Sequence, residues 1–189
     1  MGNENGCHQL IEELYRAVAA GSDVEATTRG VKQVLCDLIE HQKVQLPMIF
    51  KTAVPGSYAR RLVHKDGDLG FTVLAMAWGP GQGTPLHDHS GMWCVEAVVE
   101  GQIEVCQFRM IERAGSRFRF EPEGKVVAGI GSAGRLIPPF EYHTIANALP
   151  NSTSVTIHVY GGEMQECSIF DPRAEGWWER STRRLAYTA

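Results

Sequence analysis

The 189-residue chain lacks the features that would place it in a membrane or on nucleic acid. No run of about 18 apolar residues occurs, so we expect no membrane-spanning helix. The first residues, MGNENGCHQL, contain no apolar core of a signal peptide. A net charge of −4, with no basic stripe, argues against nucleic acid or an anionic membrane as a partner.

Paired cysteines of the kind that bridge small secreted domains or bind zinc are also missing. The five cysteines are scattered and odd in number, and no CxxC occurs. This usage favours a reducing, cytoplasmic location over a disulfide framework or a thiolate zinc site. The composition, with 43% hydrophobic and 21% charged residues, is typical of one globular domain, with or without an added lobe.

The pattern of apolar residues changes near residue 45. Before it, helical spacing predicts amphipathic helices over 7–20 and 25–42, the second capped by Ser22 or Asp23. After residue 55, short β-like runs broken by Gly and Pro predict a β-sandwich or small barrel. We therefore expect a mostly β protein, with a helical lobe over 1–50 and a barrel over 51–189 that ends in a helix or strap at 177–186. The expected strands are 58–63, 71–78, 93–100, 102–110, 125–130, 142–148 and 154–160.

The stretch TPLHDHSGMWCVEAVVEG, residues 84–101, holds the first candidate site. His87 and His89 are two residues apart, so on a strand both imidazoles face one side and can bind one metal ion. A hydrogen-bonded pair of core histidines is the alternative. Downstream, IPPFEYHTIANA places His143 after a Pro-Pro turn. His8, His41 and His64 show no such pattern, and we expect them to be structural or exposed.

These two segments resemble the two sequence boxes of the cupin superfamily. The first box has glycines at Gly81 and Gly101 around the two histidines, and the second has a proline, a histidine and an asparagine at Pro138, His143 and Asn147. Phe140 departs from the glycine usual in the second box. The resemblance implies a double-stranded β-helix, or jelly-roll barrel, with a metal bound by His87, His89 and His143.

Cys94 stands where the first box usually has a metal-binding glutamate. Without that carboxylate, three neutral imidazoles leave a divalent metal its full charge, so the centre can accept an anionic substrate. A thiol suits such a centre because it loses its proton on binding.

Over roughly residues 55–170 the chain resembles the cysteine dioxygenase family of cupins. In that family the three histidines hold Fe(II), and some members carry a thioether between a cysteine and a tyrosine, here Cys94 and Tyr160. In SVTIHVYGG, Thr156, His158 and Tyr160 are spaced by two, so a strand places all three on one face. The resemblance implies that His158 and Thr156 orient the Tyr160 hydroxyl near the reacting atoms.

The resemblance also implies a substrate anchor in YARRLV. Alternation puts Tyr58 and Arg60 on one face of a strand and Arg61 on the other. The planar guanidinium of Arg60 can pair with a carboxylate through two hydrogen bonds. The expected partners are therefore a small-molecule thiol and O2, and the expected reaction converts L-cysteine to cysteine sulfinate.

Other functions stay open on the sequence alone. Relatives that oxidise 3-mercaptopropionate tend to have glutamine at the position of Arg60, yet WGPGQGTP and HVYGG look more like those bacterial relatives. HDHSGM is similar to segments of dioxygenases that act on cysteamine or on N-terminal cysteine. A cupin that cleaves carbon–carbon bonds, or one that binds a small ligand without catalysis, would also explain three histidines.

Overall fold

The computed structural model describes the backbone of residues 3–189 and the side chains from Cys7 onwards. Helices α1 (Asn3–Ala20) and α2 (Val24–Glu40) confirm the two expected helices, and a short helix α3 (Met48–Lys51) was not expected. Asp23, rather than Ser22, caps α2, because its carboxylate accepts a hydrogen bond from the backbone N–H of Ala26 at 2.8 Å. None of the described helices is long and apolar enough to cross a bilayer.

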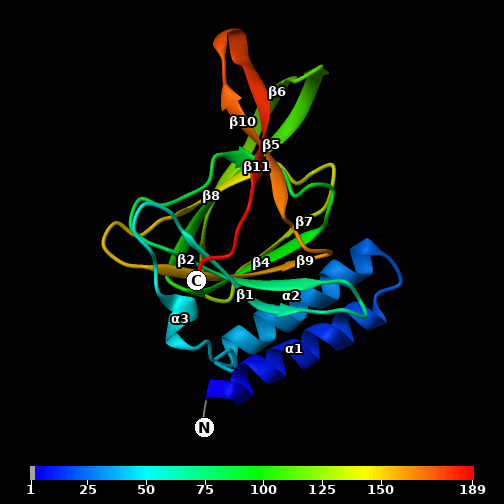
Figure 1. The fold of residues 1–189 in the computed structure, drawn as a ribbon. Helices are drawn as coiled ribbons and strands as arrows, with labels where there is room; N and C mark the ends of the chain where they lie inside the picture. The colour runs from blue at the N-terminus through cyan, green and yellow to red at the C-terminus, as the bar shows by residue number, and fades with distance from the viewer. Residues whose placement is uncertain (1–2) are drawn as a thin grey trace.

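The rest of the chain forms two antiparallel sheets, which confirms the mostly β double-stranded β-helix (Figure 1). One sheet has five strands in the order β1-β2-β9-β4-β7, and the other is closed in the order β10-β11-β6-β5-β8-β3. The strands are β1 (Ala59–Lys65), β2 (Thr72–Trp78), β3 (Leu86–His87), β4 (Cys94–Glu100), β5 (Gln102–Ala114), β6 (Arg117–Gly129), β7 (Ala133–Leu136), β8 (His143–Asn147), β9 (Ser154–Tyr160), β10 (Glu166–Pro172) and β11 (Trp177–Arg184).

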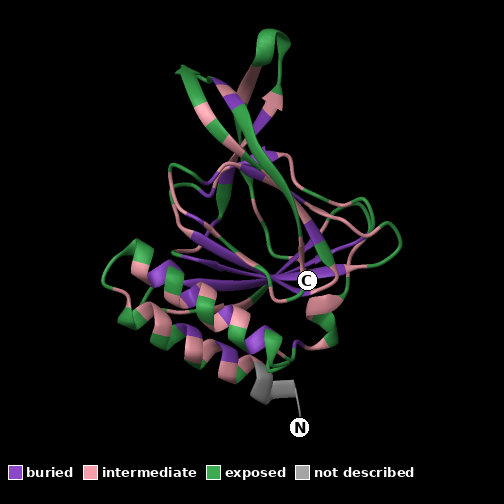
Figure 2. Cartoon of the chain, turned by 180° about the vertical axis from the view of Figure 1, so that it is seen from behind, coloured by how far each residue is buried: buried purple, intermediate pink, exposed green. Residues whose placement is uncertain are grey.

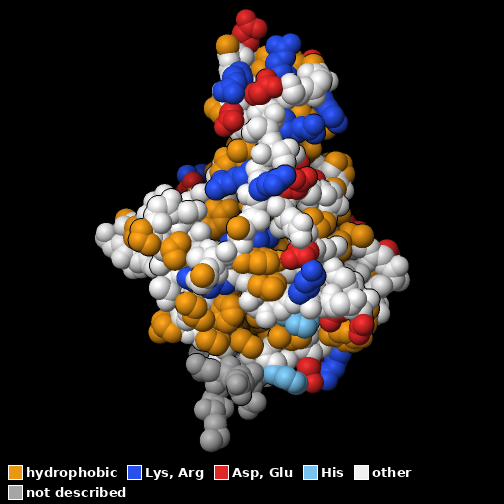
Figure 3. Space-filling view, in the orientation of Figure 1, with side chains coloured by type: hydrophobic (Ala, Val, Ile, Leu, Met, Phe, Trp, Pro, Cys, Tyr) orange, Lys and Arg blue, Asp and Glu red, His pale blue; other side chains and the backbone are white. Residues whose placement is uncertain are grey.

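The C-terminal region corrects the sequence-based expectation of a helix or strap. Residues 177–184 are strand β11, which pairs with β10 and with the beginning of β6. The hairpins β5-β6 and β10-β11 project together beyond the barrel (Figure 1), and charged side chains gather on this projection (Figure 3). Because the projecting parts expose much of both strand faces, their sequences show no clear alternation, and β3, β7, β10 and the first half of β6 were not expected.

Helices α1 and α2 cover the outer face of the five-stranded sheet (Figure 2). Their buried apolar side chains, such as Leu14 and Leu35, pack in one cluster with Val73, Val95 and Val159 of the sheet. Since successive strand residues face opposite sides, the neighbouring residues of β2, β4 and β9 point into the barrel. The helices therefore fix which side chains face the interior, where the candidate site lies.

Candidate metal centre

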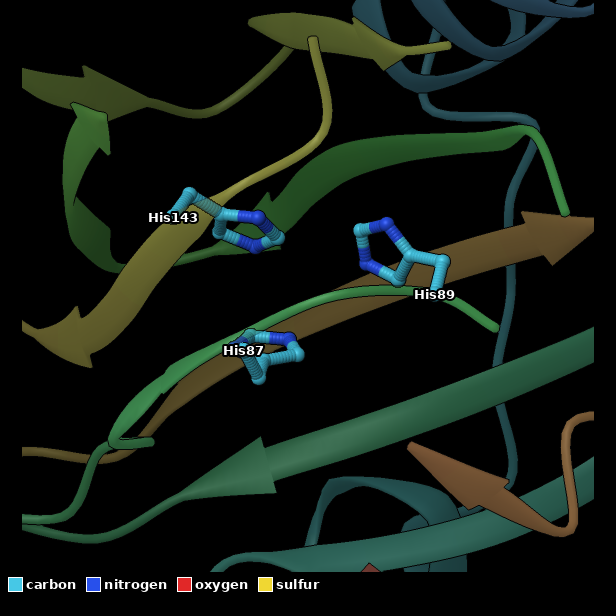
Figure 4. Close-up of side chains that lie close together, drawn as sticks. All are labelled: His87, His89 and His143. Atoms are coloured by element: carbon cyan, nitrogen blue, oxygen red, sulfur yellow. The ribbon is translucent and has the colours of Figure 1, made fainter. Parts of the chain in front are cut away.

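Three histidines from different parts of the fold meet inside the barrel. His87 ends β3, His143 begins β8, and the two residues lie directly opposite each other in the register of these strands. His89 follows two residues after His87. One ring nitrogen from each lies within 4.8 Å of the others, and all three side chains are buried and point toward one another (Figure 4).

The hydrogen bonds of these imidazoles leave nitrogen lone pairs free for a metal. Nδ1 of His87 lies 3.1 Å from the carbonyl oxygen of Pro85, and Nδ1 of His143 lies 2.9 Å from that of Glu141. A carbonyl only accepts, so each Nδ1 carries the proton and each Nε2 is left unprotonated. Burial lowers the pKa of His143 to about 3 and that of His87 well below its usual value. Three neutral imidazoles are a donor set that suits divalent iron, and also nickel, copper or zinc.

Glu141 positions the third histidine and was not singled out from the sequence. Its Oε2 accepts a hydrogen bond from the backbone N–H of His89 at 2.9 Å and lies 3.5 Å from His89 Nδ1. Glu141 is itself buried. Its position two residues before His143 was the sequence feature that could have indicated it.

Cys94 and Tyr160 lie opposite each other on the paired strands β4 and β9. Both are buried, and burial raises the pKa of each side chain well above its usual value. The condition for a thioether between them, that the two strands face each other, is therefore met.

Thr156, His158 and Tyr160 lie together on β9, as their spacing predicted. His158 Nε2 lies 2.8 Å from the Thr156 hydroxyl, and its Nδ1 lies 3.4 Å from the Tyr160 hydroxyl. The indole N–H of Trp78 donates to the Thr156 hydroxyl at 2.9 Å. Because the indole only donates, the Thr156 hydroxyl can give its own proton to His158 Nε2. Neutral His158 then carries its proton on Nδ1, towards Tyr160.

Arg60 and Tyr58 lie on the side of the barrel interior, as expected. Arg60 is 4% exposed, donates from Nη2 to the carbonyl oxygen of Met164 at 2.8 Å, and has no partner for its Nε. Tyr58 stacks on Trp78 with ring centroids 4.5 Å apart. Arg61 donates to the carbonyl of Thr52 instead.

A small pocket of about 20 Å³ joins these groups. It is lined by the three histidines together with Tyr58, Arg60, Trp78, Glu96, His158, Tyr160, Met164 and Cys167, among others. A second cavity of about 200 Å³ lies between β4, β5, β6 and β7 and shares Glu96 and Ile145 with the first. Of the side chains proposed from the sequence for the site, Cys94 and Thr156 do not line the small pocket, and all the others do. Thr156 lines the larger cavity instead, and Cys94 lies opposite the pocket residue Tyr160 in the strand register.

Glu96 is an acidic residue of the small pocket that was not predicted from the sequence. It lies opposite His158 in the register of β4 and β9, two residues beyond Cys94 on the same face. Its Oε2 is 3.5 Å from His158 Nδ1 and 3.7 Å from His143 Nε2, but makes no hydrogen bond. Burial raises the pKa of Glu96 to about 7. The sequence feature that could have indicated Glu96 is a glutamate within the otherwise apolar run WCVEAVV, at a position that faces the barrel interior.

Several known proteins resemble this chain. Cysteine dioxygenase type 1 of Danio rerio is 27% identical over 116 residues, which cover 61% of this chain and 57% of the relative. The human protein of that name is 23% identical over 116 residues, 61% of this chain and 56% of the relative. The match thus spans less than two thirds of the length of these relatives.

Solved structures were compared as well. A cupin-2 domain protein of Rhodospirillum rubrum is 13% identical, with a TM-score of 0.47, and the match covers 63% of this chain and 68% of that one. A Klebsiella pneumoniae protein with a double-stranded β-helix domain is 17% identical, with a TM-score of 0.47, over 60% of this chain and 79% of that one.

The family comparison covers most of the chain. The family model described as cysteine dioxygenase type I matches residues 33–173, which include every histidine, tyrosine and arginine of the pocket. The chain therefore belongs to the cysteine dioxygenase type I family.

Proposed function

We propose that the protein is an Fe(II)-dependent thiol dioxygenase that converts L-cysteine to cysteine sulfinate. Both atoms of O2 end on the sulfur, so the thiol is oxidised, O2 is reduced, and no other reductant is needed. The five free cysteines fit a cytoplasmic location, which is part of this proposal.

One observation carries the proposal. Three buried imidazoles and the Arg60 guanidinium line the same small pocket. His87, His89 and His143 would hold the iron, which supplies a redox centre where a thiolate and O2 react. A site of this kind accepts an anion, and the guanidinium suits a substrate that also carries a carboxylate.

Arg60 and Tyr58 would hold that carboxylate. The Arg60 Nε is buried without a partner, so a carboxylate in the pocket would satisfy it. Its bond to the Met164 carbonyl fixes the plane of the guanidinium. Tyr58, stacked on Trp78, has a hydroxyl whose raised pKa keeps it protonated and able to donate.

Tyr160 would orient the reactants by hydrogen bonding. The bonds from Trp78 through Thr156 to His158 fix that imidazole, which in turn lies against the Tyr160 hydroxyl. We also propose that Cys94 and Tyr160 form a thioether, in which a C–S bond replaces an S–H and a ring C–H and the two hydrogens pass to O2. Such a bond would lock the Tyr160 ring in place.

Oxygen consumption by the Fe(II)-loaded protein tests this function. L-cysteine, 3-mercaptopropionate, cysteamine and a Cys-initiated peptide would be compared, with mass spectrometry of the products. Uptake with L-cysteine that yields cysteine sulfinate supports the proposal. Preference for another thiol reassigns the substrate, and no uptake with any thiol by the iron-loaded protein refutes thiol oxygenation.

A further inference from the structure

Two buried side chains of opposite charge line the small pocket without satisfying each other. Arg60 and Glu96 are 4% and 8% exposed. Nε of Arg60 and Oε2 of Glu96 have no hydrogen-bond partner. Within residues 7–189, Arg60 forms no ion pair with a carboxylate. In the same part of the chain, the basic side chains within 4 Å of the Glu96 carboxylate are those of His143 and His158. Unpaired buried polar atoms of this kind are costly and are typical of sites that bind a ligand.

Neither of the histidines beside Glu96 is a committed donor to its carboxylate. His143 carries its proton on Nδ1, towards the Glu141 carbonyl, so its Nε2 has no proton to offer Glu96. His158 Nδ1 carries one proton, and the Tyr160 hydroxyl lies at 3.4 Å from it, about as close as Glu96 Oε2 at 3.5 Å. At least one carboxylate oxygen therefore faces the pocket as an acceptor without a protein donor.

Glu96 is also placed to contact a ligand. It faces the barrel interior on the same side of β4 as Cys94, and it lies where the small pocket adjoins the larger cavity. His87, His89 and His143, and not Glu96, supply the nitrogen atoms that lie within 4.8 Å of one another. Glu96 Oε2 lies 3.7 Å from Nε2 of His143, next to that group.

We propose that Glu96 is a specificity-determining residue that accepts hydrogen bonds from the amino group of the thiol substrate. This inference rests on the proposed function. The Arg60 guanidinium would bind the substrate carboxylate, and the Glu96 carboxylate would bind the substrate amino group. The pocket therefore complements a thiol amino acid. Thiols that lack the amino group leave Glu96 unsatisfied and bind less well.

Glu96→Gln tests the inference in the Fe(II)-loaded protein. The amide has nearly the same shape but removes the negative charge and places a donor in the pocket. We expect the KM for L-cysteine and for cysteamine to rise about tenfold or more, since a hydrogen bond to a charged group is lost. The KM for 3-mercaptopropionate should not rise. Equal rises for all three thiols would overturn the inference.

Binding without turnover separates this inference from the proposed function. Calorimetric titration of the Fe(II) protein without oxygen should show weaker L-cysteine binding in Glu96→Gln and unchanged 3-mercaptopropionate binding. If the wild type binds L-cysteine in this Glu96-dependent way but consumes no oxygen, the proposed function fails and the inference stands. Absence of L-cysteine binding by the wild type overturns the inference.

Two further measurements exclude a structural explanation. Glu100→Gln makes the same change on the same strand, at a residue that pairs with Lys51 outside the pocket, and should change neither KM nor binding. The iron content of Glu96→Gln should equal that of the wild type. Loss of iron would show that Glu96 serves the metal, which also overturns the inference.

Discussion

Replacing Arg60 by glutamine tests the carboxylate anchor most directly. The guanidinium is buried, is oriented by the Met164 carbonyl, and keeps its Nε unpaired. A charge-assisted hydrogen bond contributes about 1.5–3 kcal/mol. Since about 1.4 kcal/mol is a factor of ten, the KM for L-cysteine should rise about 10- to 100-fold.

Cysteamine provides the internal comparison because it has the thiol and the amine but no carboxylate. Oxygen uptake at varied substrate concentration should show an unchanged KM for cysteamine in Arg60→Gln. A rise of equal size for both thiols would refute the anchor and point to a general disturbance of the pocket.

Arg61→Gln is the matched control. Arg61 is the next residue on β1, is also buried, and also donates to a backbone carbonyl, that of Thr52 at 2.7 Å. Each variant loses one such hydrogen bond, so both should lose about 1 kcal/mol of unfolding free energy in urea. Only Arg60→Gln should change the KM for L-cysteine. An equal KM effect of Arg61→Gln would refute the reasoning.

Three more predictions concern the metal and the fold. His143→Ala should lower the iron content after gel filtration at least about tenfold, because two imidazoles bind far more weakly than three; full retention would contradict the assignment. In the metal-free protein, burial lowers the pKa of both His143 and His158 to about 3, below the unfolded value of about 6.5. The unfolded state then binds more protons below pH 6.5, so stability present at pH 7 is lost as the pH falls, by about 2 kcal/mol per histidine at pH 5. The pKa of Glu96 is raised to about 7, so this group gains stability as the pH falls and offsets part of the loss. The melting temperature should therefore fall from pH 7 to pH 5, and it should fall more steeply in Glu96→Gln. A melting temperature that does not change with pH in either protein would contradict this prediction. Leu35→Ala, which empties a buried site between α2 and the sheet, should cost about 2–5 kcal/mol in urea unfolding without changing KM.

Several features of the fold and site followed from local patterns. Helical spacing before residue 45 marked α1 and α2, because a helix that covers a sheet needs one apolar face. The spacing of His87 and His89, and the alternation of Thr156, His158 and Tyr160, placed each set on one face because strand side chains alternate. Such patterns depend only on residues close together in the chain, so the sequence alone was enough to predict them.

Strands that are short or project into solvent left no comparable pattern. β7 has four residues, and most of the β10-β11 hairpin is exposed or half-buried. Alternation appears only where one face is buried and the other is not. The expectation of a helix or strap at 177–186 was wrong for this reason, since the pairing of β11 with β10 and β6 determines its structure.

The site itself was decided partly by the sequence and partly by strand pairing. The residues alone indicated which histidines could bind a metal and which arginine could bind a carboxylate. Only the tertiary structure placed His143 opposite His87 and set Glu96 against His158. Register across a sheet joins residues far apart in the chain, so no local pattern encodes it. For that reason the sequence determined the chemistry that this protein can supply, and the fold decided that Glu96 faces the same pocket as Arg60.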